Sequence, residues 1–451
     1  MAYHLHHHSL LNLICLEDKN MDSNDNKNSN DFVTSITAAL INKRRTKKAI
    51  QKMEAGNEAK KGIQRYRSSE IEAFVNNSDI NRNIIFSGTN TYQKNKVLLS
   101  VCYYAFLEKI PVIILHERNT ELENELEATF GRTGMYTVIN EQNPCYDPFY
   151  NIDSGEVEDL LFKSTLRDRA IAATGSYYIQ GIADFIHAKG KILSTRIFIT
   201  CPHDHLFDKI DETEKKKAIA PETAKKIKSA LMQGQSERGN IERFFRDLES
   251  SGKSVLYQKN TSRDRTNIKE IAKQQKILSF DISVTGNNVL SNVALSEVEN
   301  IALSGRKFVL IIDDIVLDSN EKMVKLVKES GRNYTVTISA DDIFSVVGGD
   351  AKIFDSIVGK AEKCFIMRQS SGKSSEKWAE VIGHYEKEEL TQSQGNHMTF
   401  KGGFGYGANN SYNVNIKNDY IVKPQEIQHM NNNDVYIFDK KSGSLSFTTA
   451  L

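Results

Sequence analysis

The sequence predicts an α/β fold with a mainly parallel central sheet and a largely helical insertion. An apolar run at 83–87, a helical pattern at 96–109 and a second apolar run at 112–115 form a strand–helix–strand unit. Such a unit joins parallel strands, which are buried on both faces. Further apolar runs recur later in the chain. A stretch rich in Lys, Glu and Ala, at about 155–250, predicts the helical insertion.

Each element follows from its local pattern. In the helix predicted at 96–109, apolar residues recur at a spacing that places them on one face. Within the insertion, the amphipathic run 241–248 indicates another helix, although a strand predicted near 198 makes this region not purely helical. Short apolar runs predict the later strands, at 196–200, 254–257, 277–282, 308–312, 334–339, 364–367 and 434–438.

Composition limits the functional classes. The chain has 451 residues, 39% hydrophobic and 26% charged, with a formal net charge of +1. A chain of this length can bury a large core. Because the net charge is close to zero, no global attraction to nucleic acid or to an acidic membrane is expected. Five scattered cysteines without a CxxC pair favour a reducing, cytoplasmic compartment. Apolar runs fall short of the roughly 18 residues of a membrane span. The histidines at 4–8 resemble a tag and are left out of the fold prediction.

Composition also suggests domain boundaries. Residues 1–31 are predicted to form a disordered tail, and 32–80 a helical segment with a basic run at 43–48. That run indicates either a solvated helix face or a contact to phosphates or anionic lipid. The nucleotide-binding type of α/β core is predicted at 81–154 and 251–451, with the helical insertion at 155–250.

The first chemical motif follows the strand at 83–87 and opens a helix. It spans residues 88–95, Gly-Thr-Asn-Thr-Tyr-Gln-Lys-Asn. The phosphate-binding P-loop has the form GxxxxGK[ST], and Gly88 and Lys94 match it. Gln93 replaces the second glycine, and Asn95 replaces the hydroxyl residue that binds magnesium. A side chain at the second position obstructs close approach of phosphate. A strand-to-helix turn with a surface lysine is the alternative interpretation.

The second motif is an apolar strand that ends in two acids, Asp313 and Asp314, within 308–314. This is the pattern of a Walker B strand, in which the first acid holds the metal and the second orients water. A buried strand that leaves the core at a loop acid is the alternative. The position of this strand, about 220 residues after the P-loop-like turn in the same α/β pattern, favours the Walker B interpretation.

Other candidates are weaker. Ser339 to Asp341 ends a strand where motor ATPases place a phosphate sensor, but a helix N-cap at Ser339 is favoured. The run 201–205, Cys-Pro-His-Asp-His, is more typical of a turn than of a zinc site, because a second ligand pair is missing. Arg332 and Arg368 could act as arginine fingers across a subunit interface, but arginines at the ends of strands are ordinary. The glycine- and aromatic-rich stretch 402–407 is more typical of an exposed turn than of a loop that stacks on bases.

The order of these segments resembles the coupling ATPases of conjugation and type IV secretion, the TraG/TraD class. This class lies within the FtsK/HerA group of RecA-like P-loop NTPases. The resemblance rests on the P-loop-like turn, the Walker B strand and two longer blocks, with a closing segment at 424–438; the four main stretches are 88–95, 143–160, 308–314 and 339–383.

The resemblance implies a RecA-like core with a helical domain, a homo-oligomer such as a hexamer, and ATP and Mg²⁺ as cofactors. It implies delivery of DNA or protein to a secretion channel, with secretion or relaxosome components as partners. Lys94 would contact the β- and γ-phosphates, Asp313 the magnesium and Asp314 the water. The cofactor site would comprise Gly88, Thr89, Lys94 and Asn95.

The sequence departs from this class at Gln93, Asn95 and Asp341, and the usual N-terminal membrane spans are missing. Three functions therefore remain open. The chain is an ATPase that recruits substrate at the cytoplasmic face of the membrane, or an inactive scaffold or adaptor of the same machinery, which could assemble with an intact ATPase. The third alternative is a HerA/FtsK-like DNA translocase.

Overall fold

The computed structural model describes residues 44–165, 170–258, 265–282, 289–317, 321–396 and 408–451, and the tail predicted at 1–31 and the loop 402–407 lie outside them. The chain divides into two compact units. The first contains 44–62 and 384–421 of the described residues. The second contains 63–383 and 422–451. Each unit is described by itself.

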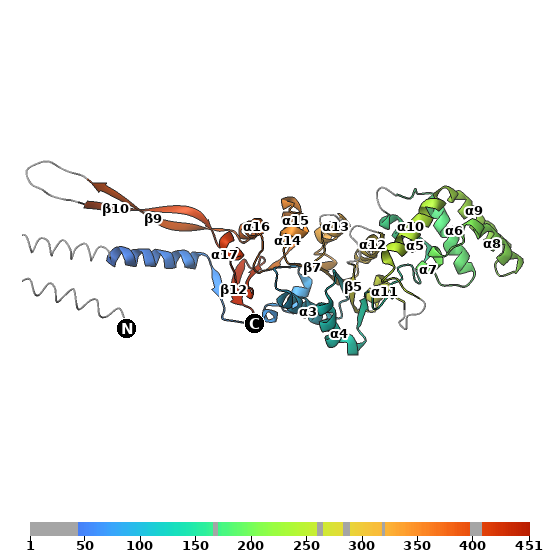
Figure 1. The fold of residues 1–451 in the computed structure, drawn as a ribbon, viewed down its shortest axis with the longest axis horizontal. Coiled ribbons are helices and arrows are strands. Elements are labelled where there is room, and N and C mark those ends of the chain that lie inside the picture. Colours follow the sequence, from blue (N-terminus) through green and yellow to red (C-terminus); the bar gives the residue numbers. More distant parts are fainter. Residues whose placement is uncertain (1–43, 166–169, 259–264, 283–288, 318–320, 397–407) are drawn as a thin grey trace, which may run out of the picture. The chain divides into compact units, whose positions relative to one another are not determined.

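The second unit is built on one ten-stranded sheet (Figure 1). Most neighbouring strands are parallel, whereas β11 runs antiparallel to both β8 and β12. Across the sheet the strands are β1 (Ile63–Arg65), β12 (Ser444–Thr449), β11 (Asp434–Asp439), β8 (Lys363–Ile366), β2 (Ile84–Ser87), β7 (Tyr334–Ala340), β6 (Phe308–Asp313), β3 (Val112–His116), β5 (Ile277–Asp281) and β4 (Tyr136–Ile139).

The predicted fold class is confirmed. If β2, β3, β6, β7 and β8 are numbered 1 to 5 along the chain, the five central strands lie in the order 5-1-4-3-2, which is the order of a RecA-like core. Because these strands are parallel, their carboxyl ends share one edge of the sheet. The turn after β2 and the acids that end β6 are therefore brought to the same edge.

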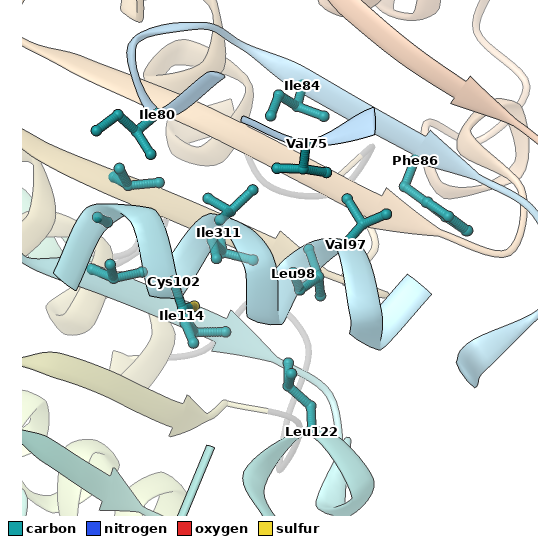
Figure 2. Close-up of a cluster of buried hydrophobic side chains, with 14 of the residues drawn as sticks. Val75, Ile80, Ile84, Phe86, Val97, Leu98, Cys102, Ile114, Leu122 and Ile311 are labelled. Carbon is teal, nitrogen blue, oxygen red and sulfur yellow. The ribbon is translucent and has the colours of Figure 1, made fainter. Parts of the chain in front are cut away.

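Helices cover both faces of the sheet (Figure 1). On one face lie α3 (Thr91–Leu107) and α4 (Thr120–Phe130). Figure 2 shows Val97, Leu98 and Cys102 of α3 pointing toward strand residues such as Ile311. The remaining helices of this layered core are α11 (Ile268–Lys273), α12 (Val289–Leu303), α13 (Glu321–Glu329), α14 (Ile343–Val346), α15 (Ala351–Lys360), α16 (Gly372–Ile382) and α17 (Pro424–Gln428).

The insertion is helical, and its helices lie together beyond the β5 side of the sheet (Figure 1). The strand predicted at 196–200 is wrong, because these residues lie mainly in helix α7 (Thr195–Ile199). Phe198 stacks on Phe245 of α10 at 4.9 Å between ring centroids, and this aromatic packing favours the helix. The helices are α5 (Ser154–Ser164), α6 (Gly175–Ala188), α7 (Thr195–Ile199), α8 (Leu206–Lys215), α9 (Pro221–Gln233) and α10 (Arg238–Gly252).

Two further predictions need correction. Residues 254–257, predicted as a strand, contribute only an isolated bridge between Leu256 and Tyr146. The helix predicted at 96–109 begins at Thr91, five residues earlier, which changes the geometry of the P-loop-like turn. Among the described residues, none of the helices combines enough length with enough apolar sequence to span a bilayer.

The first unit contains a helix at 44–60 and a long antiparallel hairpin, β9 (His384–Asn396) and β10 (Ala408–Tyr420). Asn57 joins the helix to the hairpin. Its side-chain amide donates to the carbonyl of Glu388 at 2.9 Å and accepts from the amide of Glu388 at 3.0 Å. An isolated two-stranded hairpin is marginal in water, so this helix contributes to its stability. The domain boundaries predicted from composition stay a prediction.

Candidate functional site

The P-loop-like turn is short. Strand β2 ends at Ser87 and α3 begins at Thr91, so only residues 88–90 lie between them. Gly88 has a φ of 157°, and a Cβ at this position would lie 2.4 Å from the Cβ of Met367. Gly88 therefore allows the turn to pass close to the residue that follows β8. This close approach requires glycine for packing against the chain itself.

The backbone amides in and after this turn donate hydrogen bonds within the chain. Asn90 caps α3, because its side-chain oxygen accepts from the amide of Gln93 at 3.1 Å. The amide of Lys94 donates to the carbonyl of Asn90 at 3.0 Å, and the amide of Gly88 donates to the carbonyl of Ala340 at 3.0 Å. A phosphate nest needs successive amides that point at the ligand. Here three of the relevant amides are already used within the chain.

Lys94 lies at the carboxyl edge of the sheet with both acids of the Walker B motif. Its Nζ atom donates to Oδ2 of Asp314 and lies 3.3 Å from Oδ1 of Asp313. The side chains of Lys94 and Asp313 are 2% and 0% exposed, so the pair is inside the protein. Burial opposes the charge of Lys94, but Asp313 and Asp314 more than offset it and raise the pKa of the lysine. The ammonium group therefore occupies the space beside the carboxylates that a metal ion would need.

Asp313 has further partners. The hydroxyl of Ser339 donates to its Oδ1 at 2.5 Å, and the side-chain amide of Asn119 donates to its Oδ2 at 2.6 Å. Asn119 also donates to Oδ1 of Asn95 at 3.0 Å, which joins the two motifs. The nitrogen of the Asn95 amide finds no hydrogen-bond partner among the described residues. Sequence reasoning missed Asn119, whose signal was an asparagine between a strand and an acidic helix start.

Asp314 and Asp341 complete the polar cluster. Asp314 has a φ of 53°, a left-handed conformation that aspartate tolerates better than most residues. Its Oδ1 accepts from the backbone amide of Asp341 at 3.1 Å. Desolvation, followed by the charge of Asp314, raises the pKa of Asp341. The N-cap predicted at Ser339 is wrong: Asp342 caps the next helix by accepting from the amide of Phe344 at 2.9 Å, while Ser339 serves Asp313.

Hydrogen bonds from nearby polar side chains hold the turn and its flanking residues. Gln369, which follows β8, accepts from the hydroxyl of Ser87 at 3.0 Å and donates to the Ser87 carbonyl at 3.0 Å. Trp378 donates to the same hydroxyl at 3.2 Å. Gln93, the residue at the second glycine position, donates from its side chain to the carbonyl of Leu451 at 2.9 Å. These bonds fix the turn in its observed conformation.

The weaker candidates lie elsewhere or have structural roles. In the 201–205 run, Nδ1 of His203 lies 3.1 Å from the hydroxyl of Tyr178, and Asp204 pairs with Arg238. Within the part of the chain that the structure describes, no group of three metal-ligating side chains is found. Arg332 precedes β7 and so lies at the opposite edge from Lys94, whereas Arg368 follows β8 on the same edge.

Comparison with known proteins found similar folds and no match at the level of sequence families. No family model matches the chain, and no curated protein matches it. The chain is structurally similar to the bacterial conjugative coupling protein TrwB, with 13% identity, a TM-score of 0.48, and coverage of 83% of this chain and 85% of TrwB.

Two further solved structures are similar to this chain. A TrwB structure in complex with ADP and Mg²⁺ has 12% identity and a TM-score of 0.48, and covers 88% of this chain and 92% of TrwB. VirB4 of Thermoanaerobacter pseudethanolicus has 12% identity and a TM-score of 0.36, with coverage of 69% of this chain and 83% of VirB4. TrwB is a conjugative coupling protein; at these identities the similarity concerns the fold alone.

Proposed function

We propose that this chain is a non-hydrolytic component, a scaffold or adaptor, of a conjugation or type IV secretion machine, built on the fold of its coupling ATPases. It would act at the cytoplasmic face of the membrane beside an intact ATPase or further copies of itself. The observation that carries the proposal is the position of Lys94, which is buried against both Walker B acids beneath a turn of residues 88–90.

The residues present do not fit Mg-ATP. A bound triphosphate needs the lysine to face the phosphates, whereas Lys94 is committed to Asp313 and Asp314. It needs amides free to donate, yet the amides of Gln93 and Lys94 complete the first turn of α3. Magnesium would also have to displace an ammonium group that already pairs with both carboxylates. We therefore derive no hydrolytic step from this site.

One observation favours the second candidate, an active ATPase of the same class. Gly88, Lys94, Asp313 and Asp314 do lie at one edge of the sheet, as the motifs require. For ATP to bind, α3 would have to begin later, as in the helix predicted from the sequence. Lys94 would then have to leave both acids and turn toward the phosphates. The difference between the two functions is thus a change in the first turn of one helix.

The test measures nucleotide-dependent stability and turnover in parallel. We expect millimolar Mg-ATP to produce no rise in melting temperature that depends on Lys94, and phosphate release to stay at background. A ligand at 100 times its Kd would stabilise the protein by about 2.7 kcal/mol, so binding would be visible. The variant Lys94→Ala removes the candidate lysine. Lys96→Ala is the matched control, because Lys96 lies on the same helix and is partly exposed.

Magnesium-dependent turnover that Lys94→Ala abolishes and Lys96→Ala retains would overturn the scaffold proposal and support the ATPase. Turnover that appears only with DNA, and that declines steeply with salt, would support the translocase instead. Sedimentation of the nucleotide-free protein, alone and mixed with an intact ATPase of the same machinery, then tests assembly. The scaffold proposal expects an oligomer or a complex that forms without ATP.

A further inference from the structure

A second candidate binding site lies at the opposite edge of the sheet from Lys94. It is a groove of about 810 Å³ beside the amino ends of β4 and β5, next to α11. Its volume is in the range of small-molecule sites in proteins. Its lining includes two tyrosine rings and four cationic side chains: Tyr150, Tyr257, Arg265, Lys269, Lys273 and Lys276.

Arg265 is held in place by aromatic rings. Its guanidinium carbon lies 4.9 Å from the ring centroid of Tyr150 and 4.9 Å from that of Tyr257. Cation–π contacts of this kind orient the planar guanidinium group and leave its N–H edge available. The side chain is 37% exposed, so a ligand in the groove can reach it.

The carboxylate of Asp147 does not use up the donors of Arg265. Asp147 lies 4.0 Å from Nη1 of Arg265, which is too long for a direct hydrogen bond. Oδ1 of Asp147 accepts instead from the amide of Thr195 at 2.7 Å and from its hydroxyl at 2.6 Å. Arg265 therefore presents a bidentate donor edge without a bidentate partner among the described residues.

Positive charge exceeds negative charge along the groove. Arg265, Lys269, Lys273 and Lys276 contribute four cations to its lining, and Glu270 contributes one carboxylate. Glu270 lies 3.8 Å from Lys273, and Lys269 pairs with Glu156, which does not line the groove. No ion pair of Lys276 occurs within the described residues. Lys276 is thus a cation without an ion pair among the described residues, and Arg265 has only the 4.0 Å contact with Asp147, which leaves both able to meet an anion.

We propose that this groove binds a small phosphorylated ligand of the nucleoside-diphosphate class through Arg265 and Lys276. A planar guanidinium edge matches phosphate oxygens, and lysine adds a compact charge. The tyrosine rings and polar side chains of the lining suit a base and sugar better than a lipid chain. A phosphodiester chain carries the same chemistry, so the experiment separates the two sources. The site is independent of the proposed scaffold function and contains no residue of the Lys94 cluster.

Calorimetry on the full chain, with EDTA present to exclude magnesium, tests this site with four probes. They are ADP, inorganic pyrophosphate, adenosine and a twelve-nucleotide single-stranded DNA. We expect ADP and pyrophosphate to bind and adenosine to bind at least tenfold more weakly than ADP. Arg265→Ala should weaken ADP binding at least tenfold. Arg265→Lys should also weaken it, because lysine lacks the planar bidentate edge.

Two controls separate this proposal from the first one. Lys94→Ala and Arg332→Ala should leave ADP affinity unchanged, since neither residue lines the groove. Absence of ADP binding, or equal affinity in the Arg265 variants, would overturn the proposal. ADP binding lost in Lys94→Ala would overturn it as well, by returning the ligand to the P-loop. Binding of DNA alone, abolished by the Arg265 variants, would replace the small ligand with a nucleic acid chain.

Discussion

Replacing Lys94 with methionine tests whether the buried ion pair holds this edge of the sheet together. Methionine keeps most of the length of the side chain but removes the charge, which leaves Asp313 and Asp314 facing each other without a cation. Removal of one partner from a buried pair costs about 3–5 kcal/mol, because the remaining charge is left uncompensated. At about 2–4 °C per kcal/mol for a domain of moderate size, the melting temperature should fall by on the order of 10 °C.

Scanning calorimetry of four variants measures this effect. Lys96→Met is the control, and its expected change is within about 1 kcal/mol because its partner Glu72 is partly exposed. Asp314→Asn keeps a residue that tolerates the left-handed backbone at this position. In the double variant Lys94→Met with Asp314→Asn, one carboxylate charge is gone, so part of the loss should be recovered. We expect a coupling free energy of about 0.5–3 kcal/mol.

The reasoning is refuted if Lys94→Met melts at the same temperature as the original chain. It is also refuted if the two substitutions are additive, because the lysine and the acid would then not interact in solution. An exposed lysine that awaits phosphate would give this result. A large loss with strong coupling supports a structural pair, and it strengthens the case that the lysine replaces a metal ion at this site.

Two further predictions concern other parts of the second unit. Burial, partly offset by a hydrogen bond from Tyr146, raises the pKa of Glu297 to about 8. The free energy of unfolding should therefore decrease as pH rises from about 4.5 to 8, by up to about 1.4 kcal/mol in total for each unit by which the pKa is raised. Glu297→Gln should flatten this decrease in urea unfolding at pH 6 and 8.5, and parallel curves would contradict it. Gly88→Ala should cost about 1–3 kcal/mol because its Cβ would meet Met367 at 2.4 Å. The control Gly239→Ala has open space and should change the unfolding free energy by less than about 1 kcal/mol, so equal losses in the two variants would contradict the packing argument.

The central strands were predictable because their signal is local. The run 308–312 is continuously apolar, and the strand 308–313 is buried along its length, as expected for a strand covered on both faces. The strands 112–116 and 334–340 are also buried along their lengths, although 334–340 alternates apolar residues with threonine and serine. Their parallel arrangement then followed from the helices between them. The strand predicted at 196–200 failed because a short apolar run also suits a buried helix, and the aromatic neighbours that decide are distant in sequence.

The candidate site was predictable in its residues but not in its conformation. The motifs identified Lys94, Asp313 and Asp314, which the fold brings to one edge. The early start of α3 had a local signal, since Asn90 followed three residues later by Gln93 is a helix-capping pattern. The P-loop interpretation obscured that signal. Asn119 was recognisable from the sequence only as a helix cap, and its contact with Asp313 depended on tertiary structure, because the two residues are 194 positions apart.

Trp378 is the only tryptophan in the chain, and its indole nitrogen donates to the hydroxyl of Ser87, the residue before Gly88. Tryptophan emission, excited where the 17 tyrosines absorb little, is therefore a local optical signal from beside the turn. Any event that shifts Ser87, such as unwinding of the first turn of α3, should alter the emission without any attached dye. The chain thus contains its own probe for distinguishing a closed turn from an open one.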